Sequence, residues 1–273
     1  MIAFFRRHNI FTWILSIVLS MVIMIGFLFV SESDLMSLTG DILTCLMLCI
    51  SLYAVSGKKT FEHCGDRTGY VFRTGWPILT FTLFFFVVGM GYSIADRLPM
   101  NPDWISRLGL TFIMMLFAGV NEELCYRAIA SDVLLPRLQN TKHPFLYTAV
   151  ISGLVFGIVH VFLGEYNSLL SIVLAALKIL TTFTFGASLM ILYWKTRNVL
   201  AIGILHGIYD LLPSVTDCLF VSEQAAESTG YTDGDMGSVI VYLIQLAVNL
   251  IVLHHIYRKA GTTIDFKKTL EDW

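Results

Sequence analysis

Apolar residues in this chain fall into long runs, each about the length of a helix that crosses a bilayer. Such a helix needs roughly 20 apolar residues, and eight runs meet that requirement. We expect spanning helices near residues 10–30, 35–56, 76–95, 106–135, 145–163, 167–194, 198–216 and 236–257. No internal repeat or low-complexity linker separates them. The pattern therefore predicts an all-α, polytopic membrane bundle in which residues 1–273 form a single transmembrane domain.

Composition agrees with lipid as the solvent of this chain. Hydrophobic residues make up 56% and charged residues 14%, with a mean hydropathy of +0.74, whereas soluble domains carry about 25% charged residues. A net charge of −2 gives no indication of a nucleic-acid partner. Five cysteines, an odd number, argue against a disulfide framework. The first apolar run is too long for a signal peptide and lacks a small-residue cleavage site, so we expect an uncleaved first span.

Basic residues alternate between the ends of the expected spans. Lys and Arg collect on the cytoplasmic side of membrane proteins. Under this assignment one side holds 14 of the 18 basic residues: Arg6, Arg7, Lys58, Lys59, Arg67, Arg73, Arg137, Lys142, Lys195, Arg197, Arg258, Lys259, Lys267 and Lys268. The loop 217–235 on the other side is acidic. We therefore expect a multi-pass protein of the cell membrane with both termini in the cytoplasm.

Ionisable residues inside apolar spans are costly, and each is a hypothesis for a functional site. The fourth span contains Glu122-Glu123-x-x-x-Arg127. Glu123 and Arg127 share a helix face at i,i+4 in the favourable order, which predicts an ion pair. Glu122 lies about 100° away, with no basic residue three or four positions from it. It is either a carboxylate that exchanges protons or part of a charged helix end at the membrane surface.

Two further groups lie in the fifth and seventh spans. His160 follows Phe156 at i,i+4, and it is either a site residue or a buried histidine bonded to a backbone carbonyl. His206 and Asp210 share one face at i,i+4, so Asp210 could orient the imidazole, or the pair could form a polar contact between helices. Asp41 and Lys178 could likewise be polar contacts or line a cavity.

Small residues accompany both histidines. Gly153 and Gly157 precede His160, and Gly203 and Gly207 flank His206. Such steps let helix backbones approach closely, as ordinary packing between spans or a shared site would require.

The three groups, in this order and on separate spans, resemble the CPBP family, also called the Abi family, of CAAX prenyl proteases and bacteriocin-processing enzymes. The family pattern is Glu-Glu-x-x-x-Arg, Phe-x-x-x-His and His-x-x-x-Asn or His-x-x-x-Asp. The match covers a protease core at about 105–215. The resemblance implies an intramembrane endopeptidase that acts on a membrane-associated protein or peptide, in CAAX-type processing or in bacteriocin maturation or self-immunity. No feature of the sequence indicates a prenylated substrate.

The resemblance also suggests roles. Glu122 would be the general base, because Glu123 is matched to Arg127, and His160 would help to activate the same water. His206 and Asp210 would polarise the scissile carbonyl or hold the oxyanion. Glu123, Arg127 and Phe156 would support the site.

A metal-dependent version of the site stays open. Glu122, His160 and His206 would form a His₂Glu set for one zinc ion. We favour metal-free catalysis, because no acidic residue lies within a turn of His160 to orient it, although a backbone carbonyl could do so.

A non-catalytic alternative is an immunity or transport protein that only binds a peptide or small ligand. Transporters often have paired inverted halves, and none is evident here. One geometric point opposes a shared site: at 1.5 Å per residue, His206 would lie about 12 Å and His160 about 22 Å from the cytoplasmic starts of their spans. Tilt, a broken helix or a misplaced boundary near Pro144 would reconcile the two depths.

Overall fold

Among the residues that the structure describes, eight helices are long and apolar enough to cross a membrane, as predicted. The computed structural model describes residues 2–30, 34–221, 234–265, 267 and 269. The spans cover Asn9–Phe27, Asp34–Ser56, Thr68–Ala95, Trp104–Leu138, Pro144–Val161, Leu169–Thr196, Val199–Leu219 and Met236–Thr263. The chain is thus a multi-pass, all-helical membrane protein. Part of the acidic loop 217–235 lies outside the described residues.

Several spans consist of more than one helical segment. The α-helices are α1 (Ile2–Arg7), α2 (Asn9–Val30), α3 (Asp34–Ser56), α4 (Lys59–Glu62), α5 (Thr68–Gly75), α6 (Thr80–Ala95), α7 (Trp104–Glu123), α8 (Ala130–Leu138), α9 (Pro144–Val161), α10 (Leu169–Thr196), α11 (Val199–Leu219) and α12 (Met236–Lys259). The 3₁₀ segments are η1 (Trp76–Leu79) and η4 (Gly261–Thr263), and η2 (Leu124–Ile129) is a π-helix.

The third span begins earlier than predicted, at Thr68 rather than near residue 76. The added turns are α5, whose residues include the exposed Arg73. The length of an apolar run does not reveal this extension, because a helix can continue through polar residues where its end lies outside the lipid. The 3₁₀ segment η1, with Pro77 in its first turn, joins α5 to α6.

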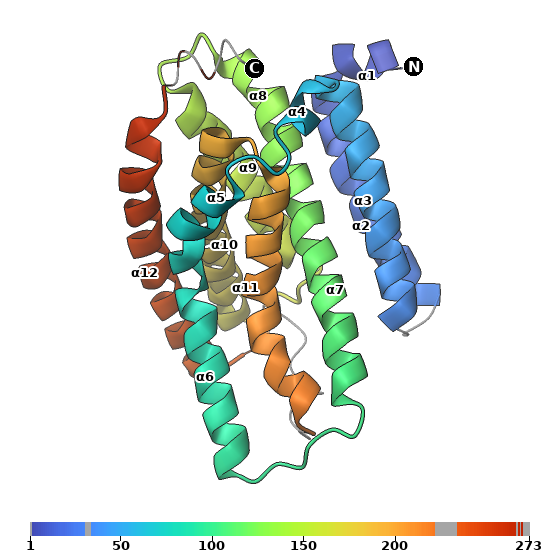
Figure 1. Cartoon of the computed structure of the whole chain (residues 1–273). Coiled ribbons are helices and arrows are strands. Elements are labelled where there is room, and N and C mark those ends of the chain that lie inside the picture. Colours follow the sequence, from blue (N-terminus) through green and yellow to red (C-terminus); the bar gives the residue numbers. More distant parts are fainter. Residues whose placement is uncertain (1, 31–33, 222–233, 266, 268, 270–273) are drawn as a thin grey trace.

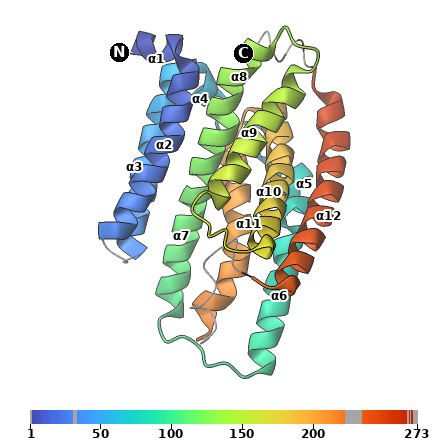
Figure 2. The same cartoon turned by 180° about the vertical axis from the view of Figure 1, so that it is seen from behind.

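The site-bearing helices lie in the middle of the bundle. Figures 1 and 2 place the α2–α3 hairpin at one side and α12 at the other, with α7, α9, α10 and α11 between them. Contacts join α2 to α3, α3 to α7, α7 to α11, α9 to α10 and α10 to α12. Outer helices expose large apolar side chains such as Leu46, Ile50, Phe84 and Ile251. Lipid is the solvent that such surfaces require.

Glycines bring α7 and α11 into backbone contact. A Cβ atom added to Gly119 would lie 2.5 Å from the carbonyl oxygen of Gly203 and from the amide nitrogen of Gly207. A Cβ atom on Gly207 would in turn lie 2.5 Å from the carbonyl oxygen of Met115. No side chain larger than hydrogen fits there, which confirms the predicted close approach around His206.

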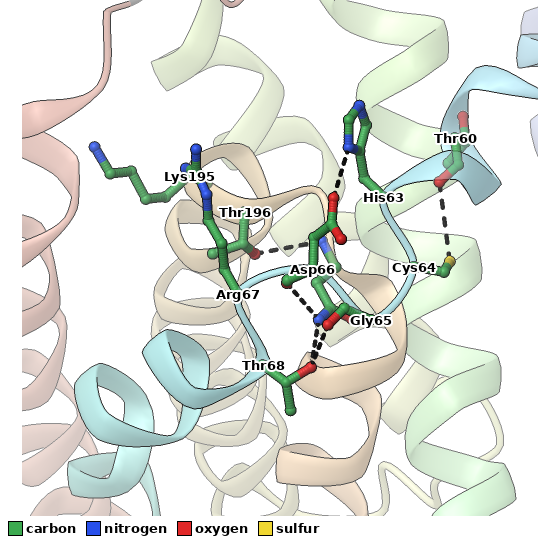
Figure 3. Close-up of polar contacts among 10 residues, drawn as sticks. Thr60, His63, Cys64, Gly65, Asp66, Arg67, Thr68, Lys195 and Thr196 are labelled. Atoms are coloured by element: carbon green, nitrogen blue, oxygen red, sulfur yellow. Dashed lines mark hydrogen bonds and ion pairs between the residues drawn. The ribbon is translucent and has the colours of Figure 1, made fainter.

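A polar cluster holds the start of α11 against the loop before α5 (Figure 3). The Asn198 amide donates to the carbonyl oxygen of Asp66 at 2.7 Å and to the Thr68 hydroxyl at 2.9 Å, and its own side-chain oxygen caps α11. The Arg67 guanidinium donates to the carbonyl oxygen of Lys195 at 3.1 Å. The tight turn between α10 and α11 passes through Arg197 in the left-handed region. Contacts with the loop before α5 therefore fix where α11 begins along the axis of the bundle.

Candidate active site

The residues predicted to form a site line one cavity. Glu122 is near the end of α7, His160 near the end of α9, and His206 and Asp210 lie on α11. All four border a cavity of about 320 Å³. The predicted convergence is therefore present, although the roles assigned to these residues stay predictions.

The Glu122 carboxylate faces both histidines. One of its oxygens lies 4.0 Å from Nε2 of His160, and the other lies 3.4 Å from Nε2 of His206. The Asp210 carboxylate lies 3.4 Å from the same His206 nitrogen. These separations are longer than a direct hydrogen bond, and the gap between Glu122 and His160 suits one bridging water.

Glu123 joins two partners, of which only one was predicted. Its Oε2 lies 3.1 Å from Nε of Arg127, and both side chains are buried, which confirms the predicted ion pair. Its Oε1 lies 2.8 Å from Nδ1 of His206. We had expected Asp210 to orient this imidazole, but Glu123 makes the shorter contact. Sequence spacing revealed only the partner on the same helix, because the Glu123–His206 contact depends on how α7 packs against α11.

His160 is oriented by its own helix. Its Nδ1 donates to the carbonyl oxygen of Phe156 at 2.8 Å, so the ring carries its proton there and directs the Nε2 lone pair toward Glu122. Of the two alternatives left open for His160, orientation by a backbone carbonyl is therefore the one observed, and the lack of an acidic partner no longer favours metal-free catalysis. A backbone carbonyl takes the place of an acidic side chain.

The Phe156 ring packs against both Arg127 and His160. Its ring lies 4.3 Å from the Arg127 guanidinium and packs edge-on against His160, with ring centroids 4.5 Å apart. Gly186 leaves room for Arg127, since an added Cβ atom would lie 2.9 Å from its guanidinium nitrogen. Phe156 and Gly186 therefore hold the ion pair and His160 in one packed unit.

A π-helical turn follows the two glutamates and was not predicted. Segment η2 leaves backbone carbonyls without their usual helical partners, and two other helices satisfy them. Trp13 Nε1 donates to the carbonyl oxygen of Cys125 at 3.1 Å, and the Ser152 hydroxyl donates to that of Tyr126. Such turns frequently occur at functional sites. No local sequence signal marks this turn, because its donors come from α2 and α9.

The depth difference between the histidines is resolved by unequal helix starts. Helix α9 begins at Pro144, as expected, and His160 is near its far end, whereas His206 is only two turns into α11. Figure 1 shows that the α8–α9 connection extends beyond the connection between α10 and α11. The long fourth span, Trp104–Leu138, carries α9 to this outer start. Both histidines then reach the level of Glu122.

Some lining residues lay outside the predicted site. Lys178 of α10 borders the cavity, which confirms the alternative that this residue lines a cavity. From α12, Gln245 donates to the Tyr209 hydroxyl at 2.8 Å, and both residues line the cavity. Lys178 had a signal, a charge within an apolar span. An isolated glutamine or tyrosine carries no such signal.

Metal binding has no further support from the geometry. Among the residues that the structure describes, no group of three His, Cys, Asp or Glu side chains is arranged to hold a metal ion. The preference for metal-free catalysis therefore stays a prediction.

Comparison with known proteins adds one match. Residues 104–212 match the family model described as type II CAAX prenyl endopeptidase, Rce1-like. The matched region contains all the predicted site residues. Neither the curated proteins nor the solved structures contain a match to this chain.

Proposed function

The core of this chain, residues 104–212, belongs to the Rce1-like family of intramembrane glutamyl proteases, and from that premise we propose that Glu122 is the general base. The chain is thus an intramembrane protease, and its proposed substrate is a membrane-associated protein or peptide. The observation that carries the assignment of Glu122 is its position between two histidine Nε2 atoms at one cavity.

In the proposed reaction a water molecule lies between Glu122 and Nε2 of His160. Glu122 takes a proton from this water as its oxygen attacks the scissile carbonyl carbon. When charged, His206 donates from both nitrogens, through Nδ1 to Glu123 and through Nε2 toward the developing oxyanion. Glu122 then passes its proton to the departing amide nitrogen as the C–N bond breaks. Glu123 positions His206, and Arg127 compensates the charge of Glu123.

The substrate class can be tested by comparing peptide termini in membranes. Cells that carry the native chain or Glu122→Ala are labelled, and new termini are identified by mass spectrometry. We expect products that depend on Glu122. C-termini that lie three residues before the encoded end would indicate CAAX-type processing, which the family name suggests, whereas internal cuts in secreted peptides would indicate bacteriocin maturation. Identical termini in both samples would contradict the proposed function.

Metal dependence is a separate prediction. We propose a metal-free site, supported by the description of the Rce1-like family as intramembrane glutamyl proteases. A strong chelator should leave the activity of a metal-free site unchanged. If the site needed zinc, the chelator would compete with the protein ligands for the ion and stop activity. Elemental analysis of the purified chain and of His160→Ala checks this. About one zinc per native chain, lost in the variant, would overturn it.

Orientation in the membrane follows from the basic residues. The end of α12 lies at the same end of the bundle as α1, as an even number of spans requires (Figures 1 and 2). We propose that this end is cytoplasmic. Reporter fusions at residues 60 and 196 should give a cytoplasmic signal, and a fusion near residue 228 an external one. A cytoplasmic signal at residue 228 would contradict the placement of the last two spans.

A further inference from the structure

The cavity of the candidate active site contains one charged side chain that the proposed reaction does not use. Lys178 of α10 lines it together with Glu122, His206 and Asp210. Lys178 follows the start of α10 at Leu169 by nine residues, or about 14 Å at the rise of an α-helix. A charge this far from the end of a span is costly and indicates a functional role.

Close packing of α9 against α10 brings Lys178 to the level of His160. A Cβ atom added to Gly157 would lie 2.9 Å from the carbonyl oxygen of Ile179 and 3.0 Å from its Cα atom, so the two backbones are in contact there. His160 follows Gly157 by about one turn of α9, and Lys178 directly precedes Ile179 on α10. The glycine step before His160 therefore also sets the position of Lys178.

Lys178 balances the charges that line the cavity. Two acidic side chains, Glu122 and Asp210, lie on its wall, and Lys178 interacts electrostatically with both. His206, which is charged in the proposed reaction, lies 3.4 Å from an oxygen of each carboxylate. When Glu122 takes the proton of the water, its negative charge passes to the carbonyl oxygen of the substrate. Both cations then face that oxygen with no change in the net charge of the cavity.

Asp210 on its own does not provide what an oxyanion needs. An oxyanion is stabilised by hydrogen-bond donors, whereas an ionised carboxylate only accepts hydrogen bonds. Asparagine, the alternative in the family pattern at this position, would bring an amide donor. Where the residue is aspartate, the donor has to come from another side chain. The ammonium of Lys178 carries three N–H donors, and its interaction with Asp210 can hold it in place.

We infer that Lys178 is a catalytic residue whose ammonium donates to the oxyanion together with Nε2 of His206, and that Asp210 is the positioning residue of this ammonium. The inference rests on the proposed function and adds a residue to the same site. As the water oxygen bonds to the carbonyl carbon, an electron pair of the C=O bond moves to the carbonyl oxygen, which accepts from both donors. The pair returns when the C–N bond breaks, and Lys178 keeps its protons throughout.

The test uses the full chain in lipid vesicles and one peptide that the native chain cleaves, found in a library of decapeptides. Lys178→Met replaces the ammonium by an apolar group of similar length. It should lower kcat about 10²–10³-fold with little change in KM, as expected for the loss of one oxyanion donor. Lys142→Met is the matched control, because it removes an exposed lysine from the connection between α8 and α9. It should leave kcat unchanged.

Two paired variants separate a hydrogen-bond donor from a simple counter-charge. Lys178→Met combined with Asp210→Asn removes both charges and supplies an amide donor, so kcat should recover by roughly tenfold or more relative to Lys178→Met. Lys178→Met combined with Asp210→Leu also removes both charges, at a similar side-chain size, but supplies no donor. Its kcat should stay at the level of Lys178→Met. Equal recovery in the two paired variants would show that Lys178 only balances Asp210, and would overturn the inference.

A mimic of the tetrahedral intermediate gives a second measurement. A phosphinic peptide with the sequence of the cleaved peptide places a charged oxygen where the oxyanion forms. Transition-state analogues follow the stabilisation of the transition state, so Lys178→Met should weaken inhibition by about the factor by which it lowers kcat/KM. Inhibition of Lys142→Met should match that of the native chain. Undiminished inhibition of Lys178→Met would contradict a contact between Lys178 and the oxyanion.

Thermal unfolding midpoints accompany every rate. If Lys178→Met is unstable, the paired variants carry the test, because neither contains a stranded charge. Failure of all three to fold would assign Lys178 a structural role, and full activity of Lys178→Met would remove it from the reaction. Either result overturns the inference and leaves the proposed function intact. If the native chain and Glu122→Gln both leave the library uncut, the proposed function fails as well.

Discussion

Glu122→Gln is expected to abolish proteolysis while leaving the fold intact. Loss of a general base lowers kcat by about 10²–10⁴-fold. Glutamine has nearly the same shape as glutamate, so packing around the side chain should not change. The Glu122 side chain is 32% exposed, and its oxygens lie 3.4 and 4.0 Å from the two histidine Nε2 atoms, so the substitution breaks no short hydrogen bond to either histidine. The measurement is kcat on a cleaved peptide, alongside the thermal unfolding midpoint of the purified chain.

Glu165→Gln supplies the matched control for this variant. Glu165 is an exposed carboxylate in the connection between α9 and α10, so the same chemical change there should alter neither rate nor stability. Full activity of Glu122→Gln would remove Glu122 from the mechanism. A parallel loss of activity and folded yield would instead assign it a structural role.

Arg127→Ala should have the largest effect on stability. The substitution strands Glu123 as a buried charge that retains only its contact with His206 at 2.8 Å. Breaking a buried ion pair by removing one partner costs about 3–5 kcal/mol. The Arg127 guanidinium also covers the Phe156 ring, so packing is lost as well. Folded yield by size-exclusion chromatography and the unfolding midpoint are the measurements.

Two comparisons separate this charge effect from a general effect of losing an arginine. Arg73→Ala removes an exposed arginine and should keep the native yield. Adding Glu123→Gln to Arg127→Ala removes the stranded charge and should recover part of the lost stability. Normal folding of Arg127→Ala, together with misfolding of Glu122→Gln, would reverse the roles assigned to the two glutamates.

Spans and motif residues could be predicted from sequence because their signals are local. Lipid requires each crossing segment to satisfy its backbone within a helix, so apolar length reveals each span. The Glu123–Arg127 pair was equally local, since residues four apart share a helix face. Charges inside apolar runs identified Glu122 and Asp210, and Lys178 as a residue that could line the cavity.

Contacts between helices could not be predicted in this way. The Glu123–His206 contact and the π-turn satisfied by Trp13 and Ser152 each join residues from different spans. Their geometry depends on where helices begin and how closely they pack, which periodicity does not encode.

The sequence by itself determined the eight helices of the described residues that are long and apolar enough to cross a membrane, and which ionisable residues they carry, because burial in lipid acts on each segment separately. Only the tertiary structure decided which nitrogen of each histidine faces Glu122, because the glycines of α7 and α11 and the offset starts of α9 and α11 set the distances between helices. Both histidines lie beside glycines in apolar spans. One is oriented by its own backbone and the other by a carboxylate 83 positions away.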